Sequence, residues 1–283
     1  MLSTIERFRN AFFEANGEDA AALITSGENR FYLTSFHSSA GAVLVTSKKS
    51  YFITDFRYAE AARRVVRDCE VICTRRTTET ICDLLKQDHA QRVLVEYDKL
   101  SLKQACLFEQ AFAAVGAAEE KGEKLDLLLQ ELRTIKTPDE IRKLKEAQKI
   151  TDDAFTHILD YIRAGRTERE VALELEFFMR KEGAEGVSFD FIVVSGKNGS
   201  LCHGVPSDKV IEDGDFVTMD TGALLHGYHA DMTRTVAVGH VSDEQRHAYD
   251  LVLKAQLDAI AAVKPGVTCG SIDKVARDIL EAE

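Results

Sequence analysis

The segment from Phe216 to Val238 constrains the fold more than any other stretch, because it predicts two strands around a short connection that contains glycine. The strands are expected at residues 216–220 and 231–238. Asp220 closes the first strand and Asp231 opens the second, so an antiparallel hairpin would place the two carboxylates side by side. Such carboxylates repel each other unless a proton or a cation lies between them.

The carboxylate pair has two interpretations. Carboxylate oxygens suit divalent metal ions, and a pair of carboxylates can bridge two ions. On spacing alone, however, aspartates that merely flank a turn are the more common explanation. The alternation of a strand places Phe216, Thr218 and Asp220 on one face and Val217 and Met219 on the other, so Asp220 lies on the more polar face.

The surrounding segments favour the metal interpretation through a resemblance to a known family. Three of them resemble, in order, the signature segments of the aminopeptidase P and proline dipeptidase (prolidase) family, the M24 metallopeptidases with the pita-bread fold. Two earlier segments, 29–36 and 54–58, are similar to the N-terminal domain of that family. The three signature segments are His203-Gly-Val-Pro-Ser-Asp208, residues 214–223 and residues 227–236.

The resemblance implies a two-domain α+β protein. Residues 1–125 would form an N-terminal α/β domain of the creatinase/prolidase type. Residues 126–283 would form the first half of a pita-bread catalytic domain. The residues themselves predict the same layout, with an alternating β/α pattern up to about residue 120 and then helices that pack on one face of an antiparallel sheet.

The resemblance also implies an activity, namely metal-dependent removal of the N-terminal residue from peptides with proline at the second position. Asp220 would chelate one of two divalent ions and Asp231 would bridge both. Mn²⁺ is the first choice, with Co²⁺ or Zn²⁺ as alternatives. His203 would be the catalytic residue that contacts the substrate or the tetrahedral intermediate. Proline-containing peptides are the expected partners, and the full-length form is expected to be a homodimer.

The sequence departs from the family pattern after Asp231. The remaining ligands of the pattern, a histidine in a His-Gly-x-Gly-His segment and two glutamates, are not matched. The chain is therefore expected to be a fragment that is inactive by itself, or a half-protein that pairs with a separate second half. Three further alternatives stay open: an Xaa-Pro dipeptidase, a metal-independent hydrolase of the same fold, and a non-catalytic binding module of that fold.

Charge and cysteine usage limit the partners and the compartment. A net charge of −11 without a compensating basic block argues against nucleic acid or an anionic membrane as a partner. The six cysteines form no CxxC pair, which suits a reducing cytoplasm. No apolar run approaches the length of a membrane span, so we expect a cytoplasmic protein.

Local signals predict most element boundaries. Thr137-Pro-Asp-Glu140 and Thr167-Glu-Arg-Glu170 are helix starts, the second of them a capping box. A strand at 190–195 leads into a loop at 196–209 that carries His203. His226 and His229 are expected to be exposed histidines in the connection between the two aspartate strands.

Overall fold

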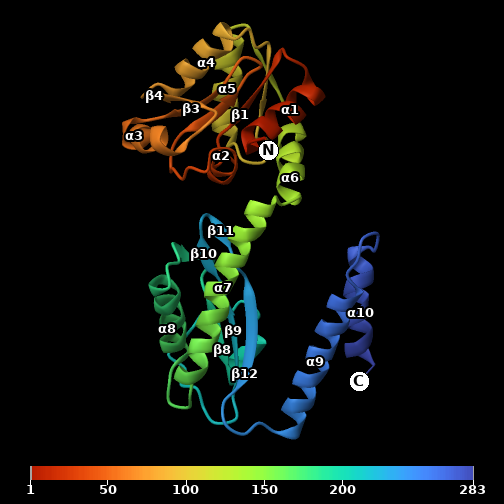
Figure 1. The fold of residues 1–283 in the computed structure, drawn as a ribbon. Coiled ribbons are helices and arrows are strands. Elements are labelled where there is room, and N and C mark those ends of the chain that lie inside the picture. Colours follow the sequence, from red (N-terminus) through yellow and green to blue (C-terminus); the bar gives the residue numbers. More distant parts are fainter. Residues whose placement is uncertain (1, 283) are drawn as a thin grey trace. The chain divides into compact units, whose positions relative to one another are not determined.

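The computed structural model describes residues 2–282 and divides into two compact units, one ending at Thr137 and the other beginning at Pro138 (Figure 1). Helix α6 (Lys124–Thr134) belongs to the first unit, because Leu125 and Leu129 are buried in its core. The sequence placed the division earlier, between residues 125 and 126. Helix α6 belongs to the first unit because its apolar face packs in the core of that unit.

The first unit is built on a mixed sheet in the order β4-β3-β2-β1-β5-β6. Strand β1 pairs antiparallel with β2 and parallel with β5, and β3 pairs parallel with β4. This confirms the predicted mixed sheet. The strands are β1 (Ala20–Ile24), β2 (Ala42–Val45), β3 (Ser50–Thr54), β4 (Glu70–Cys73), β5 (Arg92–Val95) and β6 (Ala118–Glu120).

Helices cover both faces of this sheet, so its central strands are buried on both sides. Alternate residues of β1 divide between two apolar cores: Ala20, Ala22 and Ile24 face one, and Ala21 and Leu23 face the other. Helices α1 (Thr4–Asn16), α3 (Phe56–Val65) and α6 contribute to the first core, and α4 (Thr77–Gln87) and α5 (Leu102–Ala113) to the second.

Helix α2 (Gly27–Thr34) was not predicted, although its sequence had been recognised as a family segment. It begins at Ser26, whose hydroxyl accepts a hydrogen bond from the Asn29 amide, and it ends at Ser35 in the left-handed conformation. At eight residues it is too short to show a clear helical period.

The second unit places helices on one face of an antiparallel sheet, as predicted. Helices α7 (Pro138–Tyr161) and α8 (Glu168–Lys181) pack on the sheet β12-β9-β8 (Figure 1). Val217 and Met219 of β9 point into that core, at 0% and 2% exposure, while Thr218 and Asp220 lie on the opposite face. The strands are β8 (Ile192–Ser195), β9 (Phe216–Thr221) and β12 (Met232–Ala237).

A smaller antiparallel sheet, β11-β10-β7, lies at the end of the same unit. Its strands are β7 (Gly186–Val187), β10 (Ala223–Leu225) and β11 (Tyr228–His229). Helices α9 (Asp243–Ala262) and α10 (Cys269–Glu281) follow and contact each other. Among residues 2–282 we find no helix with the length and apolar character needed to cross a bilayer.

Candidate functional site

The two aspartates come together as the sequence predicted, at the end of the β9–β12 ladder. Asp220 is paired in register with Thr233, and Asp231 directly precedes β12. The close approach depends on Gly222, because a Cβ atom there would overlap the carbonyl oxygen of Ala230 and lie 2.6 Å from its carbonyl carbon. Glycine at this position therefore lets the chain segment before Asp231 lie directly against the segment after Asp220.

The electrostatics of the pair favour a bound cation. Loss of surrounding water, then the like charge of Asp220 and a hydrogen bond between the two carboxyl groups, raises the pKa of Asp231. Within residues 2–282, Asp220 Oδ1 is a buried oxygen without a hydrogen-bond partner. A buried, unpartnered carboxylate oxygen beside a second carboxylate fits a divalent metal ion, which would satisfy the oxygen and remove the repulsion.

The described part of the chain supplies only this pair of carboxylates to such a site. Across residues 2–282 the side chains of His, Cys, Asp and Glu form no group of three or more that could hold a metal ion. The two aspartates therefore fit a divalent metal ion as part of its ligand set. Two carboxylates leave most positions around a divalent ion to other donors.

The connection between the aspartate strands is itself a hairpin, which the sequence analysis did not predict. His226 and Gly227 both have positive φ and form the two-residue turn between β10 and β11. His226 and His229 are both exposed, as expected, but His229 lies on β11 and not in a loop. Because β10 also pairs with β7, this hairpin is part of the smaller sheet and not an irregular link.

His203 lies in the exposed loop that follows the short helix η1 (Gly196–Ser200). The next residue, Gly204, is buried against β8, and a Cβ atom there would lie 2.5 Å from Val194 Cγ1. Strand β8 in turn pairs with β9, with Ile192 opposite Asp220. The loop is thus seated on the strand next to the one that carries Asp220.

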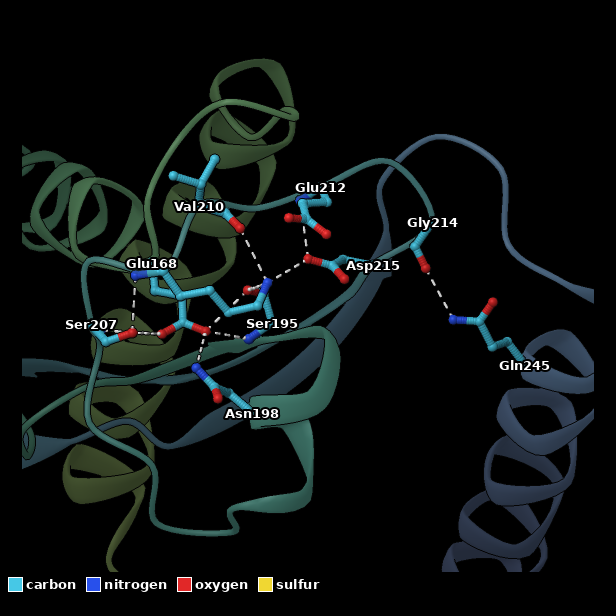
Figure 2. A network of polar contacts seen from close by, with 10 residues as sticks. Glu168, Ser195, Asn198, Ser207, Val210, Glu212, Gly214, Asp215 and Gln245 are labelled. Atoms are coloured by element: carbon cyan, nitrogen blue, oxygen red, sulfur yellow. Dashed lines mark hydrogen bonds and ion pairs between the residues drawn. The ribbon is translucent and has the colours of Figure 1, made fainter.

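A buried carboxylate holds both ends of this loop (Figure 2). Glu168, the first residue of α8, is 0% exposed. Its Oε1 accepts hydrogen bonds from the Ser195 amide and hydroxyl (2.7 and 3.0 Å) and from Asn198 Nδ2 (3.0 Å). Its Oε2 accepts from the Ser207 amide (3.1 Å) and hydroxyl (2.6 Å). The carboxylate therefore joins the start of the loop to its end.

This role of Glu168 was not predicted from the sequence, in which the residue lies inside a capping box. The box itself is present, formed by Thr167 and Glu170. The available signal was a second glutamate that the box does not use, directly after the N-cap. Such a residue is free to point away from the helix, but the sequence does not show what it meets.

The pKa of Glu168 leads to a prediction about acid. Burial alone would raise this pKa, but the hydrogen bonds from Ser207, Asn198 and Ser195 outweigh burial and hold the pKa below its usual range. A carboxyl with a lowered folded-state pKa stabilises the fold above its unfolded-state pKa, about 4.3, and loses that contribution as the pH falls through the folded-state value.

We therefore expect Glu168→Gln to cost roughly 2–4 kcal/mol of unfolding free energy near neutral pH. Urea unfolding of the wild type and the variant measures this difference. It should stay constant between about pH 8 and 6 and shrink below about pH 4.3. A difference that grows on acidification would contradict the prediction.

Each of the two units matches a known protein family. A family model described as the Creatinase/Prolidase N-terminal domain matches residues 5–135, and one described as Metallopeptidase family M24 matches residues 142–283. A mixed α/β unit followed by helices on an antiparallel, aspartate-bearing sheet is thus a two-domain protein of the creatinase/prolidase class. The chain belongs to metallopeptidase family M24. The predicted family and the predicted α+β, pita-bread fold class are confirmed.

The similar proteins include a dipeptidase and an aminopeptidase. The chain is 42% identical over 282 residues to the uncharacterized peptidase YqhT of Bacillus subtilis, covering 99% of this chain and 77% of that protein. A solved Xaa-Pro dipeptidase from Bacillus anthracis has a TM-score of 0.89 at 42% identity, covering 99% and 77% of the two chains. An X-Pro aminopeptidase from Thermotoga maritima has a TM-score of 0.88 at 34% identity, covering 99% and 78%.

Proposed function

We propose that this protein contributes the aspartate pair and the His203 loop to a metal-dependent hydrolase that cleaves the peptide bond before proline. The observation that carries the proposal is the pair itself: Asp220 and Asp231 lie together at the end of the β9–β12 ladder, and Asp220 Oδ1 is buried without a partner within residues 2–282. Similarity to Xaa-Pro dipeptidase and X-Pro aminopeptidase structures supports the substrate class.

Each residue has a distinct part in this proposal. Asp220 and Asp231 would hold the metal, and bound divalent ions supply Lewis acidity toward the scissile carbonyl and lower the pKa of the attacking water. His203 is exposed on its loop and is free to contact the substrate or donate a hydrogen bond to the developing oxyanion. Mn²⁺ is the metal that we propose to test first.

The length of the substrate is a separate question. We propose a dipeptidase, because the solved Xaa-Pro dipeptidase shares 42% identity with this chain, against 34% for the X-Pro aminopeptidase. Removal of the N-terminal residue from longer Xaa-Pro peptides, the activity expected from the sequence, is the second candidate. A dipeptidase must recognise the free carboxylate of the proline, whereas an aminopeptidase must leave room for further residues.

The experiment uses the product of the complete gene with Mn²⁺ and compares Ala-Pro, Ala-Pro-Ala, Ala-Ala and Ala-Ala-Ala. We expect cleavage before proline that a chelator abolishes and added Mn²⁺ restores, with Ala-Pro preferred over the tripeptide. Preference for Ala-Pro-Ala would show that the activity is that of an aminopeptidase and not of a dipeptidase. Hydrolysis at the same rate with and without the chelator, or of Ala-Ala as fast as of Ala-Pro, would refute the proposed function.

A further inference from the structure

Glu168 is placed where one side chain reaches both ends of the loop. As the first residue of α8 it points from the helix end toward Ser195 on one side and Ser207 on the other (Figure 2). The helix end supports the same contact. The amides of Glu168 and Arg169 donate to the carbonyl oxygens of Lys209 and Ser207, which satisfies helix donors that lack partners within the helix.

The contacts require an ionised carboxylate at this position. Both oxygens face backbone amides, that of Ser195 on Oε1 and that of Ser207 on Oε2. An amide donor cannot be reversed as a hydroxyl can. A glutamine here has the same shape, but in either orientation its NH₂ group meets one of these N–H groups. The isosteric change therefore breaks one end of the connection.

The hydroxyls of the network have a consistent donor direction. Ser195 Oγ donates to Glu168 and accepts from Lys209 Nζ at 2.9 Å, and Ser207 Oγ donates to Glu168 and accepts from the Lys209 amide at 3.1 Å. Lys209 Nζ also pairs with Asp215 Oδ2 at 2.7 Å. Lys209 thus brings positive charge to the network, and the oxygens of Glu168 are already engaged by protein donors.

Between Ser195 and Ser207 the loop is largely exposed. Leu201 and Val205 are 55% and 81% exposed, and His203 is exposed between them. The Gly204 amide donates to the Leu201 carbonyl oxygen at 3.0 Å, and Gly204 is buried against Val194. A loop that is exposed in the middle keeps its conformation chiefly through its ends, so the orientation of His203 depends on Glu168.

We propose that Glu168 is the positioning residue of the candidate site: it fixes the loop that presents His203 without touching the substrate. The inference rests on the proposed function for the role of His203, but the contact between Glu168 and the loop is independent of that function. Losing Glu168 should loosen the loop first, and should lower activity only through His203.

The test compares Glu168→Gln with a matched control in the other unit, Glu96→Gln. Glu96 is also 0% exposed and accepts hydrogen bonds from the same kinds of donor, on Thr25, Ser26 and Asn29. Hydrogen–deuterium exchange is followed on residues 196–209 in the complete gene product. We expect exchange there to rise about tenfold or more in Glu168→Gln and to stay unchanged in Glu96→Gln. Ser207→Ala is the milder variant should Glu168→Gln not fold. It removes the 2.6 Å hydroxyl contact with Glu168 and the acceptor of the Lys209 amide, but keeps the bond from the Ser207 amide to Glu168.

The second measurement is a double-mutant cycle with His203→Ala on Ala-Pro hydrolysis. If Glu168 acts through His203, kcat/KM of the double variant lies within about twofold of that of His203→Ala alone, and Glu168→Gln alone loses a comparable factor. Unchanged exchange over residues 196–209, or losses that multiply in the double variant, would overturn the inference. A wild type without Xaa-Pro hydrolysis would refute the proposed function instead, and exchange alone would then decide whether Glu168 holds the loop.

Discussion

Asp231→Asn is expected to weaken Mn²⁺ binding by the complete gene product more than about tenfold, because asparagine lacks the charge of the carboxylate that would hold the metal beside Asp220 under the proposed function. The metal-free protein should not lose stability, and its unfolding temperature should rise slightly. The reason is that the change removes one of two adjacent like charges, and the new amide can donate to Asp220. Isothermal titration calorimetry and thermal unfolding measure the two effects.

The matched control for this change is Asp208→Asn. Asp208 is an exposed aspartate of the same unit whose partner is Arg169 at 2.8 Å. Its loss should leave the metal affinity unchanged and alter stability by less than about 1 kcal/mol. Equal metal affinity in Asp231→Asn and the wild type would contradict the metal-binding role. The two aspartates would then be residues that merely flank a turn.

Gly222→Ala should be the most destabilising single methyl addition that we predict, at roughly 3 kcal/mol or more of unfolding free energy. The added Cβ would overlap the Ala230 carbonyl oxygen, and that neighbour is backbone, which cannot rotate away. The segment before Asp231 would have to move from β9, so metal affinity should fall together with stability. Urea unfolding and calorimetry on the same sample test the two consequences.

Gly199→Ala is the control for Gly222→Ala. A Cβ at Gly199 meets no atom within 4 Å among the described residues, and its φ is not in the left-handed region. The change should therefore stay within about 0.5 kcal/mol of the wild type. Similar unfolding curves for Gly222→Ala and the wild type would show that the strands tolerate separation, and the close approach at Gly222 would then not be what brings the aspartates together.

The sequence was a good guide wherever the physical cause is local. The capping box at Thr167 and Glu170 starts α8 where predicted, because a hydroxyl and a carboxylate three residues apart satisfy each other's amides. The alternation in β9 correctly divided Val217 and Met219 from Asp220, because successive side chains of a strand point to opposite faces. The pairing of Asp220 with Asp231 followed from the same alternation and from the order of the strands.

Where several segments had to meet, the sequence was not sufficient. The hairpin of β10 and β11 is stabilised by pairing with β7, which lies far earlier in the chain, so its short apolar run looked like a connection. Helix α6 begins at the predicted domain boundary, and only the burial of its leucines in the first core assigns it to the first unit. The intrinsic helix or strand propensity of such short segments is weak, so tertiary contacts determine which structure they form.

Glu168 shows the difference most clearly. From the sequence it is one of several acidic residues in the first turn of a helix, where a carboxylate is favourable and usually solvated. The tertiary structure buries it and surrounds it with donors from Ser195, Asn198 and Ser207. The sequence by itself determined the family and the proximity of the two aspartates, because both depend on neighbours along the chain. The tertiary structure decided what holds the His203 loop, because those hydrogen bonds join residues that are 27 to 39 positions apart.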